Sequence, residues 1–354
     1  MKEFKKIGIL TSGGDAPGMN AAVRAVVRTA LALDVEVLGI YRGYSGLISG
    51  DIRKLEIRDV SNIINKGGTM LFSDRCPEFK TPEGMAKAVE QCKKFGIDGI
   101  IAIGGDGTFR GATDLTAHGI PCIGIPATID NDITSTDNTI GYDTAMNTVI
   151  DLVDKLRDTC ESHARCNVVE VMGRGAGDIA LNAGIASGAT AVVIPEFPVD
   201  AEYVIQQIEI GKSLGKRNFI VLVSEGVGFD FGPMLTKRIE EATGVETKFA
   251  RLAHVVRGGN PTLRDRVLAS TYGVMAVEQL LKGMSNIVMC DRDGVIIPCD
   301  INYALVLDRM YKGTLKEGDL EAFSTEDQQK MQNDIRRRQV RMARLYGISK
   351  TINL

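Results

Sequence analysis

The sequence lacks several features that mark whole classes of protein. It contains no tryptophan, only 5% aromatic residues and only 10 prolines among 354 residues. It has no run of about 18 apolar residues, so it predicts no membrane-spanning helix. Hydrophobic residues make up 44% of the chain, which excludes a disordered or collagen-like protein. At about 150 residues per domain, the length predicts two domains, or one large domain with an excursion.

An excess of charge of either sign is also missing. The 42 Lys and Arg residues are balanced by 45 Asp and Glu residues, so we expect no nucleic-acid or membrane partner and only local anion sites. The seven cysteines form no C-x-x-C pair, which excludes a zinc ribbon and predicts reduced thiols. The first apolar run, Ile7–Leu10, is too short for a signal peptide, and we expect a cytoplasmic protein.

Glycine, by contrast, is abundant. The 39 glycines cluster at the ends of apolar runs, where they allow tight turns and close approach to a ligand. Short apolar runs alternate with segments of helical period, which predicts an α/β fold with mostly parallel sheets. We expect strands at residues 6–10, 35–40, 99–104, 121–125, 167–172, 191–194, 218–223 and 286–289. We expect helices at residues 19–32, 83–95, 143–160, 201–214, 233–243, 262–283 and 326–345.

The first strand is followed by the glycine-rich segment T-S-G-G-D-A-P-G-M-N, residues 11–20, and then a helix. Backbone N–H groups and a positive helix end meet at such a turn, which favours phosphate binding over a purely structural turn. Met19 and Asn20 stand where a Walker A loop needs Lys and Ser or Thr, so this is not a P-loop. It also lacks the G-x-G-x-x-G pattern of dinucleotide-binding turns.

The third expected strand is followed by G-G-D-G-T, residues 104–108, and a helix. A carboxylate at a helix start would repel a bare phosphate, but a bridging Mg²⁺ removes the conflict. Asp106 is therefore a candidate metal ligand, and Thr108 a phosphate-binding or helix-capping residue. A capping role for Asp106 is the alternative.

The fourth expected strand is followed by P-A-T-I-D-N-D, residues 126–132. If this segment is extended, Asp130 and Asp132 point to the same side, since side chains alternate along a strand. One carboxylate can then activate a hydroxyl while the other organises a cation, which suits phosphoryl transfer. An Asx turn is the alternative.

Further glycine-rich turns follow later strands, in the segments 171–178, 224–226 and 253–261. They predict a second anion site with Glu225 reading a hydroxyl and Arg257 supplying positive charge. His254 by itself would be structural.

These motifs, in this order and spacing, resemble the 6-phosphofructokinase family over residues 5–315. The resemblance implies Mg-ATP-dependent phosphorylation of the 1-hydroxyl of fructose 6-phosphate, a step of glycolysis, by a homotetramer. It also implies two βα-sandwich (Rossmann-like) domains with the chain crossing between them. The implied boundaries are 1–141 plus 256–306 for the larger ATP-binding domain, 142–255 plus 307–325 for the smaller sugar-phosphate domain, and 326–354 for a C-terminal basic helical extension.

The resemblance also implies residue roles. Asp130 matches the catalytic base, Thr128 and Asp132 its companions, and Arg174 the cation that assists transfer. The positions that match ATP contacts are Gly14, which also matches a catalytic position, Tyr44, Arg75, Cys76, Gly105, Asp106, Gly107, Thr108 and Gly111, with Asp106 on Mg²⁺. The sugar-phosphate positions are Thr128, Asp130, Asp132, Arg165, Met172, Gly173, Arg174, Glu225, Lys248, His254 and Arg257, of which Arg165 and Lys248 match residues of a neighbouring subunit.

Departures from the family pattern bear on specificity and regulation. Lys248 replaces an Arg and loses its bidentate fork on phosphate. Gly107 and Ala127 stand where pyrophosphate-using relatives have Asp and Lys, which favours ATP as the donor. The positions that match the site for a nucleotide or phosphoenolpyruvate effector are Arg24, Arg28, Arg157, Lys216 and Arg217, but Ile57, Asn62, Thr190 and Asn218 replace other members of that site. We therefore expect weakened or altered regulation.

Other functions remain as alternatives. A pyrophosphate-dependent enzyme, or one that prefers sedoheptulose 7-phosphate, is the nearest. A non-catalytic regulatory subunit is disfavoured because Asp106, Asp130, Asp132 and Arg174 are all present. The arginine-rich C-terminal segment is expected to be a solvated helix face or a subunit contact.

Overall fold

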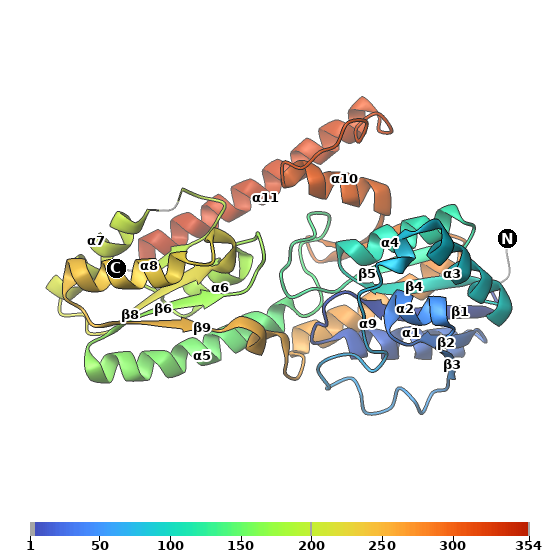
Figure 1. The fold of residues 1–354 in the computed structure, drawn as a ribbon, viewed down its shortest axis with the longest axis horizontal. Coiled ribbons are helices and arrows are strands. Elements are labelled where there is room, and N and C mark those ends of the chain that lie inside the picture. Colours follow the sequence, from blue (N-terminus) through green and yellow to red (C-terminus); the bar gives the residue numbers. More distant parts are fainter. Residues whose placement is uncertain (1–3, 199, 353–354) are drawn as a thin grey trace. The chain divides into compact units, whose positions relative to one another are not determined.

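The computed structural model describes residues 4–198 and 200–352, which form two compact units (Figure 1). The first unit comprises the described residues of Met1–Ile129, Ile133–Asp143 and Arg257–Gln332, and the second those of Asp130–Asp132, Thr144–Val256 and Asn333–Leu354. Residues 307–325, which the expected boundaries assign to the smaller domain, lie in the first unit. ATP binding by the larger domain and sugar-phosphate binding by the smaller domain stay predictions.

The first unit is built on a seven-stranded sheet with the order β11-β10-β5-β4-β1-β2-β3. The strands are β1 (Lys6–Ser12), β2 (Glu36–Ile40), β3 (Ile52–Leu55), β4 (Gly99–Gly104), β5 (Cys122–Pro126), β10 (Ile287–Arg292) and β11 (Val295–Asp300). Every pairing is parallel except those of the two edge strands, β3 on β2 and β11 on β10. The carboxyl ends of β1, β4 and β5 therefore share one edge of the sheet, where α/β folds bind ligands.

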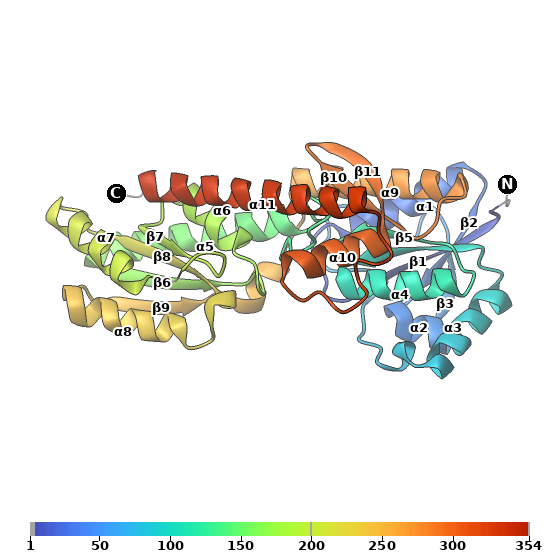
Figure 2. The same cartoon turned by 90° about the horizontal axis from the view of Figure 1, so that it is seen from above.

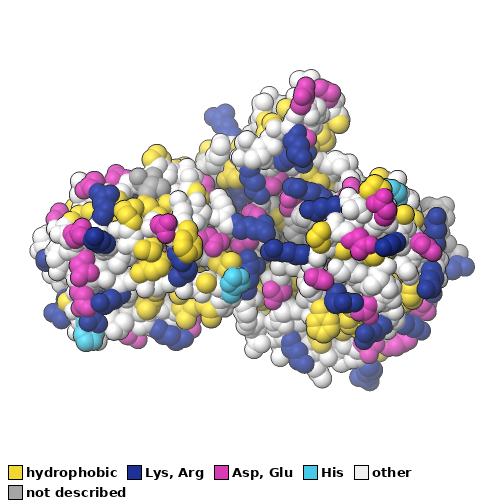
Figure 3. Space-filling view, in the orientation of Figure 1, with side chains coloured by type: hydrophobic (Ala, Val, Ile, Leu, Met, Phe, Trp, Pro, Cys, Tyr) yellow, Lys and Arg dark blue, Asp and Glu magenta, His cyan; other side chains and the backbone are white. Residues whose placement is uncertain are grey.

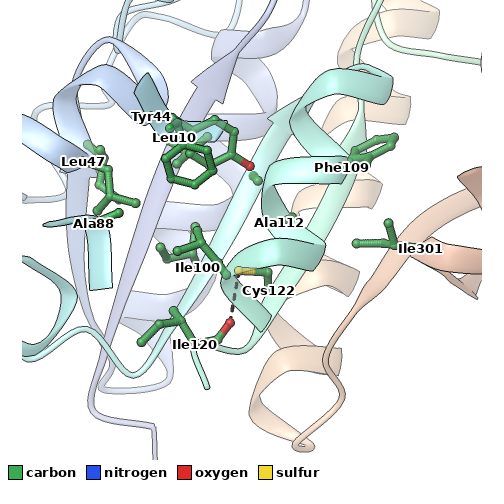
Figure 4. Packing of buried hydrophobic residues seen from close by; sticks show 14 of the residues in the cluster. Leu10, Tyr44, Leu47, Ala88, Ile100, Phe109, Ala112, Ile120, Cys122 and Ile301 are labelled. Carbon is green, nitrogen blue, oxygen red and sulfur yellow. Dashed lines mark hydrogen bonds between the residues drawn. The ribbon is translucent and has the colours of Figure 1, made fainter. Parts of the chain in front are cut away.

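Helices cover both faces of this sheet (Figure 2). The helices α1 (Met19–Ala32) and α9 (Leu263–Leu281) pack together on one face. The other face carries α2 (Gly43–Ser49), η1 (Glu78–Lys80), α3 (Pro82–Phe95), α4 (Asp106–Ala117) and α10 (Ile301–Tyr311). Apolar side chains from β1, β4, α2, α3, α4 and α10 meet in one buried cluster, which includes Leu10, Ile100, Leu47, Ala88, Phe109 and Ile301 (Figure 4).

The second unit has a four-stranded parallel sheet with the order β7-β8-β6-β9. Its strands are β6 (Cys166–Val171), β7 (Ala191–Val193), β8 (Phe219–Ser224) and β9 (Thr247–Arg251). Its helices are α6 (Asp178–Ala186), α7 (Ala201–Ser213), η2 (Glu225–Val227) and α8 (Phe231–Thr243), with most of α5 (Tyr142–His163) and η3 (Ala253–Arg257). The last helix, α11 (Thr325–Ile352), belongs to this unit from Asn333 onward. Val221 faces α7 and α8, whereas Leu222 faces α6, so alternate residues of β8 are buried on opposite faces. Such two-sided burial explains the continuous apolar runs from which the strands were predicted.

The α/β prediction is confirmed, and all the predicted strands and helices are present. Their ends shift by at most three residues, except that the last helix continues to Ile352, seven residues beyond its predicted end. The predicted ranges lack β3, β9, β11, α2, α6 and α10, and also α4, which was expected after residues 104–108 without bounds. The missed strands are edge strands, and β11 is mostly exposed, so they carry no buried apolar run. Within residues 4–198 and 200–352, no helix is long and apolar enough to cross a membrane.

Basic and acidic side chains are mixed over the visible face of each unit (Figure 3). This distribution agrees with the balanced charge of the sequence.

Candidate active site

The turn between β1 and α1 has the backbone geometry of a ligand-binding loop. Gly13 and Gly18 have φ angles of +85° and +110°, in the region that favours glycine. At Gly14 a Cβ atom would lie 3.1 Å from Nη1 of Arg257, so glycine leaves room for this guanidinium group. The structure thus brings together one residue predicted for the nucleotide and one predicted for the sugar phosphate.

Asn20, which follows this turn, has a role that the sequence analysis missed. Its side-chain amide donates to the carbonyls of Lys66 and Gly67, both at 3.1 Å, and its Oδ1 accepts from the N–H of Met70 at 2.7 Å. These bonds hold the segment after β3 against the start of α1. In the sequence, the signal for this role is a polar residue at the start of a helical segment. The structure shows that this residue is buried, where a polar side chain needs hydrogen-bond partners.

The turn between β4 and α4 places Asp106 at the first helical position. Gly105 and Gly107 on either side have open space where a Cβ atom would be. The Thr108 hydroxyl donates to the carbonyl of Ser12 at 3.1 Å, which ties this turn to the β1–α1 turn. The two phosphate-binding candidates therefore lie side by side, as the parallel pairing of β1 and β4 requires.

Asp106 fits a role in holding Mg²⁺ with a nucleotide. Its Oδ2 pairs with Nη2 of Arg110 at 2.6 Å. No cluster of three or more His, Cys, Asp or Glu side chains suited to a metal ion occurs among the residues that the structure describes. A single carboxylate is the usual protein share of a Mg²⁺ site that phosphate oxygens and water complete.

Tyr44 and Gly111, both predicted to contact ATP, are packed together beneath α4. The Tyr44 ring stacks on Phe79 with centroids 4.1 Å apart, and its hydroxyl donates to the carbonyl of Thr108 at 2.6 Å. A Cβ atom at Gly111 would lie 2.6 Å from the Tyr44 ring. Burial raises the pKa of Tyr44 well above its ordinary value. In this structure both residues support the first turns of α4. Of the other residues predicted to contact ATP, Arg75 is exposed and Cys76 is half-buried.

The segment after β5 is a turn, so the expectation of an extended segment was wrong. Asn131 has a φ angle of +49°, which breaks the alternation on which that expectation rested. Asp130 and Asp132 nevertheless converge on one group, because Arg174 Nε lies 3.5 Å from Asp130 Oδ2 and Arg174 Nη1 lies 3.5 Å from Asp132 Oδ2. Asp130 is only 2% exposed, whereas the Arg174 side chain is 66% exposed. Thr128, just before the turn, is held by its N–H, which donates to the carbonyl of Ile140 at 3.1 Å.

The loop after β6 presents Arg174 to these carboxylates. Arg174 has a φ angle of +53°, and a Cβ atom at Gly173 would lie 2.5 Å from the carbonyl oxygen of Ala176. Glu225 Oε1 accepts from the N–H groups of Gly173 and Arg174 at 3.1 and 2.8 Å. Glu225 therefore fixes the start of the loop in addition to its predicted role as a hydroxyl reader. Met172 is buried at the end of β6.

Arg165 and Lys248 are not brought to Asp130 and Arg174. Arg165 precedes β6 while Arg174 follows it, and six strand residues separate the two sheet edges by roughly 20 Å. Arg165 Nε and Lys248 Nζ pair with the carboxylate of Glu246 at 2.6 and 2.9 Å. Hydrogen bonds from Arg165 and then Lys248 lower the pKa of Glu246 to about 2. His254 is exposed in η3.

The predicted effector residues fall into two groups. Arg24 and Arg28 lie one turn apart on α1 in the first unit. In the second unit, Arg157 Nη1 donates to Asn218 Oδ1 at 2.8 Å, and Lys216 has a pKa lowered by burial and by Arg157. Arg217 is exposed beside them.

The sequence of the chain matches known proteins over most of its length. Residues 6–280 match the family model described as phosphofructokinase. The chain is 60% identical over 282 residues to the ATP-dependent 6-phosphofructokinase of Bacillus licheniformis, covering 79% of this chain and 87% of the relative. The enzyme of the same name from Bacillus subtilis is 58% identical over the same length and the same shares of the two chains.

Solved structures share the fold. Phosphofructokinase from Saccharomyces cerevisiae has a TM-score of 0.83 and 32% identity, covering 94% of this chain and 50% of that one, so this chain spans half the length of the yeast chain. A pyrophosphate-dependent phosphofructokinase from Marinobacter aquaeolei has a TM-score of 0.74 and 23% identity, covering 84% of this chain and 83% of that one. From its sequence and its fold alike, the chain belongs to the phosphofructokinase family.

Proposed function

We propose that this protein transfers the γ-phosphoryl group of ATP to the 1-hydroxyl of fructose 6-phosphate, giving fructose 1,6-bisphosphate and ADP in glycolysis. The observation that carries this proposal is the convergence of Asp130 and Asp132 on Arg174, with both N–O distances at 3.5 Å. A buried carboxylate beside an exposed guanidinium group suits a base next to the cation that receives phosphoryl charge. The names of the Bacillus relatives support the substrate pair.

In this mechanism Asp130 accepts the proton of the 1-hydroxyl while the oxygen of that hydroxyl attacks the γ-phosphorus atom of ATP. The bond between the γ-phosphorus and the β–γ bridging oxygen breaks, and ADP leaves with that electron pair. Arg174 neutralises charge on the transferring group, and the exposed turn at Gly13 and Gly14 accommodates the phosphates. Asp106 would hold Mg²⁺, which when bound offsets the negative charge of the phosphate oxygens.

Three further assignments belong to the same proposal. We infer a homotetramer in which a neighbouring subunit supplies Arg165 and Lys248, because these residues lie at the opposite sheet edge from Arg174. We also infer a cytoplasmic location. Regulation through the effector residues Arg24, Arg28, Arg157, Lys216 and Arg217 would be weakened or altered, since Thr190 supplies no carboxylate that could hold the Mg²⁺ of an activator.

Substitution of the base tests the mechanism. We expect Asp130→Ser to lower kcat by about 10²- to 10⁴-fold, the usual share of general base catalysis, while fructose 6-phosphate binding is largely kept. The matched control is Asp154→Ser, which removes an exposed carboxylate from α5 in the same unit. Steady-state kinetics and calorimetric binding give both quantities, and unchanged turnover in Asp130→Ser would rule out the role of Asp130.

A pyrophosphate donor is the second candidate function. The open space at Gly107 favours ATP, because nothing lies within 4 Å of a Cβ atom there and a nucleotide has room. Preference for sedoheptulose 7-phosphate, or a non-catalytic regulatory role, has no comparable observation in its favour.

A further inference from the structure

The last helix, α11, reaches the turn that carries the catalytic carboxylates. Arg338 of α11 donates from Nη2 to the carbonyl oxygen of Asn131 at 2.7 Å and to Asp178 Oδ2 at 3.1 Å. Its side chain is 14% exposed, as is that of Asp178. All these residues belong to the second unit. Arg338 and Asn131 are 207 positions apart in the sequence, and Arg338 lies beyond the family match, which ends at residue 280.

Both acceptors of Arg338 adjoin proposed catalytic groups. Asn131 lies between Asp130 and Asp132 in the sequence. Its positive φ angle is part of the turn and contributes to the orientation of its carbonyl group. Asp178 is the first residue of α6, directly after the loop that carries Arg174. The guanidinium group of Arg338 therefore links the turn of Asp130 and Asp132 to the loop that carries Arg174. We call the contacts of Arg338 with Asn131 and Asp178 the Arg338 bridge.

The loop of Arg174 is fixed at its other points by carboxylates. Glu225 accepts from the N–H groups at its start, and Glu196 Oε1 accepts from the N–H of Gly177 at its end, at 2.7 Å. Burial raises the pKa of Glu196, and the hydrogen bond from the N–H of Gly177 is the largest effect that opposes this rise. The Arg338 bridge is a second connection between this loop and the carboxylate turn, beside the ion pairs of Arg174 with Asp130 and Asp132.

The helix itself is docked firmly enough to position a side chain. Tyr346 stacks on Phe197 with ring centroids 4.3 Å apart, and Lys350 Nζ lies 4.6 Å from the ring centroid of Tyr203. Met342 and Ser349 of α11 are buried. These contacts limit the freedom of the helix around Arg338.

We propose that Arg338 is a positioning residue for phosphoryl transfer, which holds Asp130 and Arg174 in register through Asn131 and Asp178. This role rests on the proposed function, because Arg338 acts only through those groups and needs no contact with substrate. Reaction rates depend steeply on such alignment, and a misplacement of about 1 Å costs on the order of 100-fold in rate. Both hydrogen bonds come from one nitrogen atom, Nη2. A lysine keeps the charge and can donate to two acceptors, but its shorter side chain places the nitrogen differently, so we expect it to replace Arg338 only in part.

The test compares the wild-type protein with Arg338→Met, Arg338→Lys and Arg336→Met. Arg336 is an exposed arginine on the same helix and provides a control matched in charge and chain length. We expect Arg338→Met to lower kcat by about 10- to 100-fold with KM values for both substrates within about twofold of wild type. The kcat of Arg338→Lys should lie between those of Arg338→Met and the wild type, and the kcat of Arg336→Met should match that of the wild type. We also expect millimolar guanidinium ion to restore part of the turnover of Arg338→Ala and to leave Arg336→Met unchanged.

Hydrogen exchange supplies a readout that does not depend on turnover. Peptides covering residues 129–133 should exchange faster in Arg338→Met than in Arg336→Met or the wild type. If Arg338→Met does not fold, Arg338→Lys and rescue of Arg338→Ala decide the question. Wild-type kcat in the Arg338 variants, or an equal loss in Arg336→Met, would overturn the positioning role. Absence of wild-type turnover with ATP and fructose 6-phosphate would overturn the proposed function instead, and exchange would still report whether Arg338 fixes the turn.

Discussion

At the scale of single residues, we expect Gly107 to influence which donor the β4–α4 turn can accept. It follows Asp106, and apart from its chain neighbours and the nearby backbone of its own helix, no atom of residues 4–198 and 200–352 lies within 4 Å of where a Cβ would lie. A larger side chain therefore fits the fold but enters the space proposed for the nucleotide. A carboxylate there would stand beside Asp106 and repel phosphate. Folding and donor binding can therefore be separated at this one position.

We predict that Gly107→Asp lowers kcat/KM for ATP by about tenfold or more, because a second negative charge faces the phosphates. The melting temperature should stay near that of the wild type. Gly107→Ala, which adds a methyl group without charge, is the control and should keep most of the activity. Equal kinetics for Gly107→Asp and Gly107→Ala would contradict the placement of ATP at this turn.

At the scale of elements, α4 depends on close packing beneath its first turns. Tyr44 stacks on Phe79, donates to the carbonyl of Thr108 and leaves no space for a side chain at Gly111. In an open helix, alanine in place of glycine stabilises by about 1 kcal/mol. At Gly111 the clash with the Tyr44 ring should make the same substitution destabilising.

We predict that Gly111→Ala lowers the free energy of unfolding by about 1–3 kcal/mol, the usual cost of overpacking a core. Urea unfolding followed by circular dichroism measures this change. Gly107→Ala in the same helix is the matched control, because its added Cβ meets nothing. A stabilised Gly111→Ala would show that Tyr44 moves aside readily and does not brace the helix.

Elements buried on both faces were predictable from the sequence, and exposed edges were not. The runs that became β4, β5 and β8 are apolar throughout because helices cover both sides of them. The edge strand β11 is largely exposed although Val295, Ile296 and Ile297 are apolar, and Pro298 interrupts the run. The glycine turns were found because glycines directly follow apolar runs in the sequence, and the parallel pairing of β1 and β4 brings two of these turns to one edge.

The candidate site was predictable in its members but not in its connections. The sequence indicated Asp130 and Asp132 as a pair, yet their convergence on Arg174 depends on the left-handed turn at Asn131. Among the arginines of the last helix, nothing in the sequence distinguishes Arg338, because its acceptors lie far away along the chain. Long-range contacts of this kind arise from tertiary packing.

At the scale of the whole molecule, the opposite ends of β6 carry cations with different proposed tasks. Arg174 follows the strand and faces Asp130, whereas Arg165 precedes it and pairs with Glu246. One chain does not place both at one substrate. The proposed site shared between subunits would explain the separation.

We predict that a mixture of two impaired variants regains activity. Arg165→Ala should bind fructose 6-phosphate weakly and Asp130→Ser should turn over slowly. After joint dissociation and reassembly, about a quarter of shared sites would contain both wild-type residues under random pairing. Each variant taken alone through the same treatment is the control, and a mixture no more active than the average of the two would contradict a shared site.

Phosphoryl transfer from ATP is tested most directly by product formation, using the purified wild-type protein with Mg²⁺ and fructose 6-phosphate and either ATP or pyrophosphate. We expect fructose 1,6-bisphosphate with ATP and none with pyrophosphate, because the turn at Gly107 is open and Ala127 offers no cation. Product with pyrophosphate alone would contradict the donor assignment. Product with neither donor would contradict the proposed function itself.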